Sequence, residues 1–167
     1  MLTHSPLIRS VEVEQHFPSS VSIVLEESKP VASTFDAGKA TVYSERGRVL
    51  PFSTSTAIRL PVVDSESSDE IKSICRFLSA MQKFDPRQYA LVSQVGWSKE
   101  NLAFEVFFRD AEFHVLYPQT GWNKGLFELY DMVKAGFPSD LRCAGEVDMR
   151  FAGFAYVRNF DKRCVNG

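Results

Sequence analysis

The sequence predicts an α+β fold, in which a β-hairpin precedes a mixed, mostly antiparallel sheet with two helices packed on one of its faces. Two observations support this prediction. Several stretches alternate apolar and polar residues, which is the pattern of strands, and two longer stretches repeat apolar residues at helical spacing. Proline, glycine, serine and aspartate separate these stretches and favour turns. At 167 residues the chain is long enough for one or two small domains.

The first predicted element is a hairpin made of residues 7–15 and 20–27. Val11 and Val13 alternate with glutamates, and Val21 and Ile23 begin a second alternating run. This period of two is typical of strands buried on one face, so we expect both strands to be half-buried. Residues 16–20 lie between them and contain proline and two serines, which favour a turn.

A second strand pair is predicted at residues 30–35 and 39–44. Asp36-Ala37-Gly38 separates the two runs, and Asp and Gly favour tight turns. Another turn at residues 45–48 leads into residues 49–52. We expect a polar connection at 53–56 and an exposed polar loop at 64–68, because neither contains apolar residues that a core would need.

The first helix is predicted between Ser67 and Pro86. Ser67 and Glu70 have the spacing of a capping box, and proline ends helices. Apolar residues recur at positions i, i+3, i+4, i+7 and i+10 and predict one buried face, formed by Ile71, Ile74, Cys75, Leu78 and Met81.

The second helix is predicted after three strands at residues 89–97, 102–108 and 113–116. Thr120 is its expected cap, and Gly136 and Pro138 are expected to end it. Its apolar face is formed by Trp122, Leu126, Leu129 and Val133. We expect Trp97 and Trp122 to pack in the core rather than to stack on nucleic-acid bases.

Composition excludes several classes of protein. Hydrophobic residues make up 44% of the chain, which is typical of a globular protein and not of a disordered one. The net charge of −2 offers no general electrostatic reason to bind nucleic acid. No run approaches the roughly 20 apolar residues of a membrane-spanning helix, and the first residues lack the features of a signal peptide.

The sequence contains no recognisable catalytic or metal-binding motif. His4, His16 and His114 are far apart, and the cysteines at positions 75, 143 and 164 have neither metal-ligand spacing nor a CxxC pattern. The adjacent carboxylates Glu26-Glu27 and Asp69-Glu70 suit a strand end and a helix N-terminus better than acid–base chemistry. We therefore expect no catalytic residues, no metal and no cofactor.

The final predicted strand, residues 153–158, is the candidate binding element. As the last strand of its domain, it is expected to have one neighbour and an unpaired edge. Edge strands are usually blunted by proline or inward-facing charge, and Phe154, Ala155, Tyr156 and Val157 contain neither. Such an edge accepts a strand from a partner protein. The alternative is that another strand or the C-terminal tail covers it.

Several short motifs, taken in order, resemble the FtsQ/DivIB family of bacterial cell-division proteins. They are Phe17-Pro18, then Glu27-Ser28-Lys29-Pro30-Val31-Ala32, then Leu60-Pro61, and finally Val147-Asp148-Met149-Arg150-Phe151 followed by Gly153. The likeness covers nearly the whole chain. The sequence departs from the family at Ser28, where Arg is common, and at Ser44, where Asp is common.

The resemblance implies a domain organisation and a location. Residues 1–30 would be the C-terminal part of a POTRA-like domain, residues 31–160 an FtsQ-like β domain, and residues 161–167 a polar tail. The protein would act on the extracytoplasmic (periplasmic) face of the bacterial inner membrane. The single-pass anchor would be missing from this chain.

The resemblance also implies a function. The chain would be a non-catalytic scaffold of the divisome that recruits FtsB- and FtsL-type partners during septation by strand addition at its C-terminal edge. The hairpin near Phe17-Pro18 would face other members of the divisome, which are further candidate partners. The partner-binding residues would be Phe151, Gly153, Phe154, Ala155, Tyr156 and Val157. The structural motif residues would be Phe17, Pro18, Pro30, Asp148 and Arg150. For Asp148 and Arg150 the alternative is that they form only a structural salt bridge. Two alternatives remain open: a POTRA-type module of outer-membrane assembly or secretion, and a small-molecule-binding α+β domain.

Overall fold

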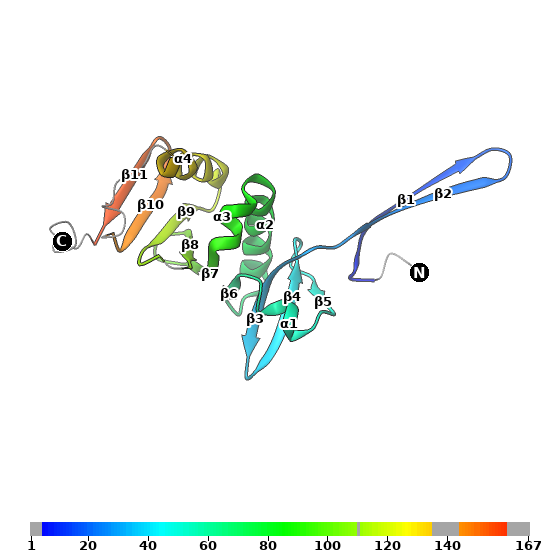
Figure 1. The fold of residues 1–167 in the computed structure, drawn as a ribbon, viewed down its shortest axis with the longest axis horizontal. Coiled ribbons are helices and arrows are strands. Elements are labelled where there is room, and N and C mark those ends of the chain that lie inside the picture. The colour runs from blue at the N-terminus through cyan, green and yellow to red at the C-terminus, as the bar shows by residue number, and fades with distance from the viewer. Residues whose placement is uncertain (1–4, 110, 135–143, 160–167) are drawn as a thin grey trace.

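The computed structural model describes residues 5–109, 111–134 and 144–159, and it confirms the predicted α+β fold. A two-stranded antiparallel hairpin precedes a mixed sheet of nine strands in the order β11-β10-β9-β8-β7-β6-β3-β4-β5 (Figure 1). The four helices of the described residues all belong to the part of the chain that forms this larger sheet. No helix among these residues is both long and apolar enough to cross a membrane.

The N-terminal hairpin consists of β1 (Ile8–His16) and β2 (Ser20–Glu27), close to the predicted bounds. The prediction that both strands are half-buried is wrong, because every residue of β2 and the second half of β1 are exposed. Figure 1 shows the reason: the hairpin projects from the rest of the molecule, so no second layer of the described chain lies against it. Its two faces nevertheless differ, since Val13 opposes Ile23 on one face and Glu12 opposes Val24 on the other.

The base of the hairpin is tied to the larger sheet by polar contacts. The Arg9 guanidinium lies 2.6 Å from a Glu26 carboxylate oxygen and 3.3 Å from one of Glu45. Arg46 donates a hydrogen bond to the Arg9 carbonyl oxygen at 3.4 Å. Arg9 therefore links β2 to the turn that follows β4.

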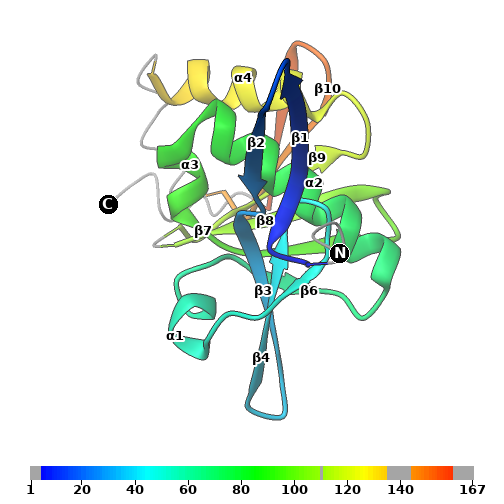
Figure 2. The ribbon, with the colours of Figure 1, turned by 90° about the vertical axis from the view of Figure 1, so that its right-hand side faces the viewer.

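The next strands match the prediction closely. β3 (Pro30–Asp36) pairs with β4 (Lys39–Ser44), and the two-residue loop between them has positive φ angles at Ala37 (44°) and Gly38 (81°). Positive φ at both loop positions suits the right-handed twist of a hairpin. This hairpin extends away from the α4 end of the molecule (Figures 1 and 2). β5 (Val49–Leu50) then pairs with β4.

The polar connection predicted at residues 53–56 instead contains a short helix, α1 (Thr54–Ala57). It forms because its one apolar residue, Ala57, is buried against Val42 and Leu50. Ser33 also donates a hydrogen bond to the Ala57 carbonyl oxygen at 3.0 Å. Since Ser33 and Val42 oppose each other in the ladder, α1 covers one face of this end of the sheet.

The first predicted long helix is confirmed as α2 (Ser68–Phe84), which follows β6 (Val62–Asp64). All five residues predicted for its apolar face are buried, together with Phe77. The predicted capping box is not formed, because the Ser67 side chain makes no cap hydrogen bond. The Glu70 carboxylate instead accepts a hydrogen bond from Ser65 Oγ at 2.6 Å.

The strand predicted from residue 89 begins later, because residues 86–91 form a helix, α3 (Pro86–Leu91). The Asp85 side chain caps this helix by accepting hydrogen bonds from the backbone N–H groups of Arg87 and Gln88. Pro86 occupies the first helical position. The backbone N–H group that proline lacks would have no acceptor within the helix there, so proline is tolerated. β7 (Val92–Ser98) then follows.

The remaining elements complete the sheet. β8 (Ala103–Phe108) and β9 (His114–Pro118) continue the antiparallel meander, and α4 (Trp122–Lys134) leads to β10 (Glu146–Phe151), which pairs with β9 in parallel. Parallel pairing requires such a crossover. The predicted helix-ending residues Gly136 and Pro138, and the side chain of Val133, lie outside the described residues.

The main core lies between the sheet and the helices α2, α3 and α4. Phe77 of α2 is central, with its ring 4.8 Å from that of Phe104, 5.4 Å from that of Tyr117 and 5.5 Å from that of Trp122. Trp97 and Trp122 pack against this core, as predicted. Because Val147 and Met149 of β10 face the same core, the alternate residues of β10 point to the opposite face, on which α1 packs only at the β3–β5 end.

Candidate functional site

The candidate site is the edge of the sheet formed by β11 (Phe154–Arg158). β11 is first in the strand order and, within the described residues, pairs only with β10. One side of its backbone is therefore unpaired there, as the sequence indicated. The alternative that the tail covers this edge concerns residues 160–167, which lie outside the described residues.

The predicted partner-binding residues gather at this edge. Phe154 is 65% exposed, Phe151 and Tyr156 are each 49% exposed, and Val157 is 39% exposed. Ala155 packs against the core and anchors the strand. Large apolar side chains with this exposure are unusual as a group and mark interaction surfaces.

The turn between β10 and β11 is held by α4. Phe151 pairs with Phe154 across a two-residue loop, and Gly153 in that loop has φ of 81°, which disfavours residues with a Cβ. The Gly153 N–H donates a hydrogen bond to Glu128 Oε1 of α4 at 2.7 Å. This contact fixes the position of the edge relative to the helical layer.

Three aromatic side chains form a cluster beside the edge. The Tyr156 ring lies 5.2 Å from Phe151 in an edge-on arrangement and 6.4 Å from Phe154. The Arg150 guanidinium lies 5.8 Å from the centre of the Phe151 ring, within the range of a cation–π contact. We call Phe151, Phe154 and Tyr156 the aromatic cluster.

Beneath this edge lies the buried carboxylate of Asp148. Its side chain is fully buried, and it accepts hydrogen bonds from Arg150 Nε at 2.8 Å and from Arg150 Nη2 at 2.6 Å. Arg158 of β11 adds a third side-chain hydrogen bond at 3.1 Å. The Arg150 side chain also donates to the Asn101 carbonyl oxygen at 2.7 Å. The charged pair of the sequence motif is thus a structural ion pair that joins β10, β11 and the β7–β8 turn.

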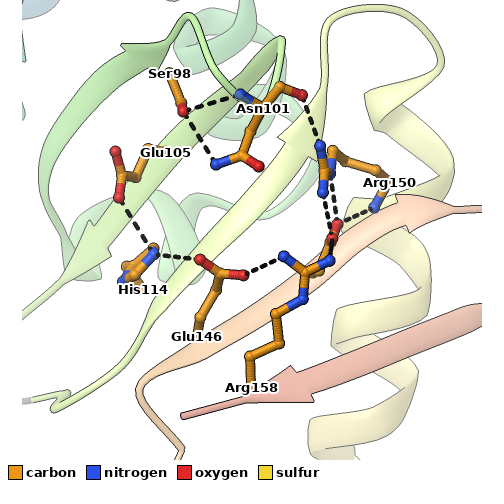
Figure 3. Close-up of polar contacts among 8 residues, drawn as sticks. Ser98, Asn101, Glu105, His114, Glu146, Arg150 and Arg158 are labelled. Atoms are coloured by element: carbon orange, nitrogen blue, oxygen red, sulfur yellow. Dashed lines mark hydrogen bonds and ion pairs between the residues drawn. The ribbon is translucent and has the colours of Figure 1, made fainter.

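A second set of polar residues, made of two glutamates, an arginine and a histidine, extends this network across four strands. One Glu146 carboxylate oxygen lies 3.3 Å from Arg158 Nη1, and the other lies 3.2 Å from His114 Nε2. The same His114 nitrogen lies 3.2 Å from a Glu105 carboxylate oxygen (Figure 3). Figure 3 shows these side chains on the face of the sheet opposite α4. The network therefore connects β8, β9, β10 and β11 on the face opposite α4 and ties the edge strand to its neighbours.

Burial and the neighbouring arginines have opposite effects on the pKa of the Asp148 carboxyl group. Burial alone would raise the pKa of its carboxyl group, but the hydrogen bonds from the Arg150 side chain and backbone, and the charges of Arg150 and Arg158, hold the pKa below its ordinary value. The hydrogen bond to Asp148 raises the pKa of Arg150, although burial opposes this shift. Both groups are therefore charged at neutral pH.

Sequence reasoning missed the role of Glu105, His114, Glu146 and Arg158. Each occupies a polar position in an otherwise mostly apolar strand, and that signal was visible. Strand alternation could not show that the four meet, because β9 and β10 are distant in sequence and become neighbours only through the parallel crossover.

The other predicted motif residues do not join this site. Phe17 and Pro18 lie at the tip of the β1–β2 hairpin, where Phe17 is 95% exposed, and Pro30 begins β3 near the other end of the sheet. The adjacent carboxylates Glu26-Glu27 and Asp69-Glu70 also lie outside this site. Glu26 forms an ion pair with Arg9, and Asp69 forms one with Lys72. In the described ranges, no group of three or more His, Cys, Asp or Glu side chains is arranged to hold a metal ion.

The cysteine that the structure describes is inert in character. Cys75 of α2 is a free thiol inside the core, and burial, followed by the nearby Glu45 carboxylate, raises its pKa to about 12. It therefore behaves as the small buried hydrophobe that the sequence indicated. Cys143, Cys164 and His4 lie outside the described residues.

Comparisons with known proteins found similarity only at the level of solved structures. No protein-family model and no curated protein matches the chain. Among solved structures, it is similar to the major extracytoplasmic domain of the trans isomer of the bacterial cell division protein DivIB from Geobacillus stearothermophilus. The TM-score is 0.49 and the identity 16%, over 66% of this chain and 94% of that one. This likeness does not establish membership of the family.

Proposed function

We propose that the chain is a non-catalytic scaffold that binds a partner protein by strand addition at β11. The observation that carries the proposal is the unpaired β11 edge with the aromatic cluster exposed beside it. The backbone of such an edge supplies hydrogen bonds to an added strand, and side chains on one face supply specificity. Tyr and Phe side chains at an interface contribute large contact areas at low entropic cost.

The charged network has a supporting role in this proposal. A partner strand binds well only to an edge that is already in its bound conformation, because ordering a loose strand on binding reduces affinity. Asp148, Arg150 and Arg158 join β10 to β11, and Glu128 holds the connecting turn. The edge is therefore preorganised, and the three aromatic rings are held on one surface.

The sequence motifs support a more specific proposal. Their order resembles the FtsQ/DivIB family, so we assign FtsB- and FtsL-type division proteins as the partners and septation at the bacterial inner membrane as the process. The same motifs assign residues 1–30 to the end of a POTRA-like domain. The exposed apolar face of the β1–β2 hairpin, with Val13 and Ile23 opposite each other, supports this assignment because a two-stranded hairpin is marginally stable alone.

The test is calorimetric titration of the chain with the periplasmic segments of FtsB- and FtsL-like proteins. Two matched variants, Ala155→Pro and Tyr156→Pro, locate the interface. Backbone N–H groups alternate along a strand, so one of these residues donates toward β10 and the other points outward. The outward substitution removes only the donor that an added strand would use, and it is identified as the variant whose unfolding transition is unchanged.

We expect the folded parent to bind and the outward proline variant to lose binding. Binding that is equal in the parent and in the folded proline variant would place the interface elsewhere and overturn strand addition. A folded parent that binds neither segment would overturn the assignment of partners and favour the other two functional classes that the sequence left open.

A further inference from the structure

The open edge of β11 is also suited to pair with a second copy of this chain. Its extended backbone covers the five residues Phe154–Arg158, and a residue with positive φ stands at each end, Gly153 at 81° and Asn159 at 53°. The strand at the opposite end of the sheet, β5, has only two residues. In the described chain, β11 is therefore the longer of the two edge strands of the nine-stranded sheet.

Antiparallel pairing of β11 with itself has one register that uses the whole strand. If Tyr156 lies on a two-fold axis, it opposes Tyr156 of the second copy. Ala155 then opposes Val157, and Phe154 opposes Arg158, so all five residues have a partner. A shift by one residue is excluded, because outward-pointing backbone groups alternate along a strand. A shift by two residues leaves only three of the five residues paired.

The side chains that oppose each other in this register are compatible. Arg158 is the only charged residue of β11, and it meets the ring of Phe154 rather than a like charge. Its side chain is 48% exposed although it also pairs with Glu146 and Asp148 of β10. Like charges directly opposite each other destabilise a strand pair, whereas an arginine beside an aromatic ring is favourable. The sequence of β11 is therefore self-complementary.

The same two-fold axis brings the two aromatic clusters together. When two copies of one strand pair edge to edge and antiparallel, the axis is perpendicular to the sheet, so equivalent faces lie on the same side. Phe151, Phe154 and Tyr156 of one copy then adjoin those of the other. The helix α4 packs on β9 and β10, so it does not occupy the outer side of β11. Burial of the rings adds apolar area to the backbone hydrogen bonds.

The size of this contact predicts a weak dimer. One five-residue strand and three rings from each copy fall at the low end of specific interfaces, below about 1,200 Å² in total. Such contacts are typical of transient complexes, so we expect a reversible dimer. The net charge of −2 per chain adds little repulsion between the copies.

We propose that two copies of this chain pair antiparallel through β11, with Tyr156 on the two-fold axis, and form one continuous sheet. Self-pairing uses the open edge on which the proposed function also rests, and it requires no partner protein. The two uses exclude each other, because one edge accepts only one strand. A second copy therefore covers the aromatic cluster until a partner strand displaces it.

The first test is sedimentation equilibrium of the chain alone at up to about 1 mM, a range that includes weak specific binding. Tyr156→Lys and Tyr156→Glu each place two like charges on the axis, and thermal unfolding verifies that both variants fold. Each should weaken dimerisation at least about tenfold, and an equimolar mixture of the two should form dimers again. Ile23→Lys, at a position of β2 that is 56% exposed, is the matched control and should dimerise as the parent does.

Disulfide cross-linking tests the register without adding a charge. A Cys143→Ser, Cys164→Ser background leaves Cys75, which is buried, so an introduced cysteine is the reactive one. Tyr156→Cys places two thiols across the axis with Cα atoms about 4.5–5.5 Å apart, which a disulfide spans. Phe154→Cys is the control, because its two copies are offset by four residues, about 13 Å along the strands. Random collision would instead favour position 154, which is 65% exposed against 49% at position 156.

We expect concentration-dependent dimers of the parent, recovery of dimers in the mixture, and faster cross-linking at position 156 than at position 154. A parent that stays monomeric at about 1 mM, a mixture that does not recover dimers, or equal cross-linking at both positions would overturn the proposal. The titration with partner segments is a separate measurement. A monomeric chain that binds a segment overturns only the dimer, and a dimer that binds neither segment overturns only the assigned partners.

Discussion

Asp148 and Arg150, two residues apart on β10, form a two-bond ion pair in which one oxygen accepts from Arg150 Nε at 2.8 Å and the other from Nη2 at 2.6 Å. Their separation of two residues places both on the same face of the strand. Asp148 is fully buried, whereas the Arg150 side chain is 21% exposed. This buried ion pair therefore stabilises the edge of the sheet from inside the protein.

Removing the carboxylate of Asp148 should destabilise the protein. We expect Asp148→Asn to lower the free energy of unfolding by about 2–4 kcal/mol, somewhat less than for a fully buried pair because Arg150 reaches solvent. Chemical denaturation measures this change, with the exposed Glu14→Gln as the control. Replacing both partners, as in Asp148→Leu with Arg150→Met, should cost less than the two single changes summed. Strict additivity would contradict the pairing.

The contribution of Asp148 should disappear in acid. Its folded-state pKa is lowered from the ordinary value of 3.8, so the unfolded state binds protons more readily as the pH falls. The stabilisation is complete above the unfolded-state pKa and is lost as the pH falls through the folded-state pKa. The difference in unfolding free energy between the parent and Asp148→Asn should thus be constant from about pH 5 to 8 and shrink below about pH 4. A difference in unfolding free energy that grows toward low pH would contradict a lowered folded-state pKa of Asp148.

The exposure of the β1–β2 hairpin predicts unequal costs for two similar substitutions. Ile23 is 56% exposed on β2, whereas Ile74 of α2 is fully buried. Ile23→Ala should change the unfolding free energy by no more than about 0.5 kcal/mol, and Ile74→Ala should cost about 2–5 kcal/mol. Thermal or chemical unfolding of both variants makes the comparison. Equal costs would mean that the hairpin is covered in solution.

The Cys75 thiol should be unreactive until the protein unfolds. It is fully buried, and its pKa is raised to about 12, so little thiolate forms near neutral pH. The measurement is labelling with a chromogenic disulfide reagent in a Cys143→Ser, Cys164→Ser background, with and without denaturant. We expect labelling only with denaturant. Rapid labelling of the folded protein would contradict the packing of α2.

Local sequence patterns were sufficient for the elements that depend on neighbours along the chain. The alternation in β1 to β4, the turn at Ala37-Gly38 and the apolar face of α2 all follow from residues close in sequence. The two short helices were not predicted, because a local pattern needs more residues than they contain. α1 depends on Ala57 packing against Val42, and α3 on the Asp85 cap, so neither has a periodic pattern long enough to detect.

Burial and the composition of the site depended on contacts between distant residues. The period-2 pattern of β1 and β2 identified two distinct faces, but only the tertiary structure shows that no layer of the described chain covers them. Likewise, the sequence predicted a strand with large aromatic side chains at residues 153–158, and the structure has it at Phe154–Arg158. The parallel pairing of β9 with β10 decided that His114 meets Glu146, and strand order decided that β11 lies at an edge, because pairing partners are chosen by the packing of the whole sheet.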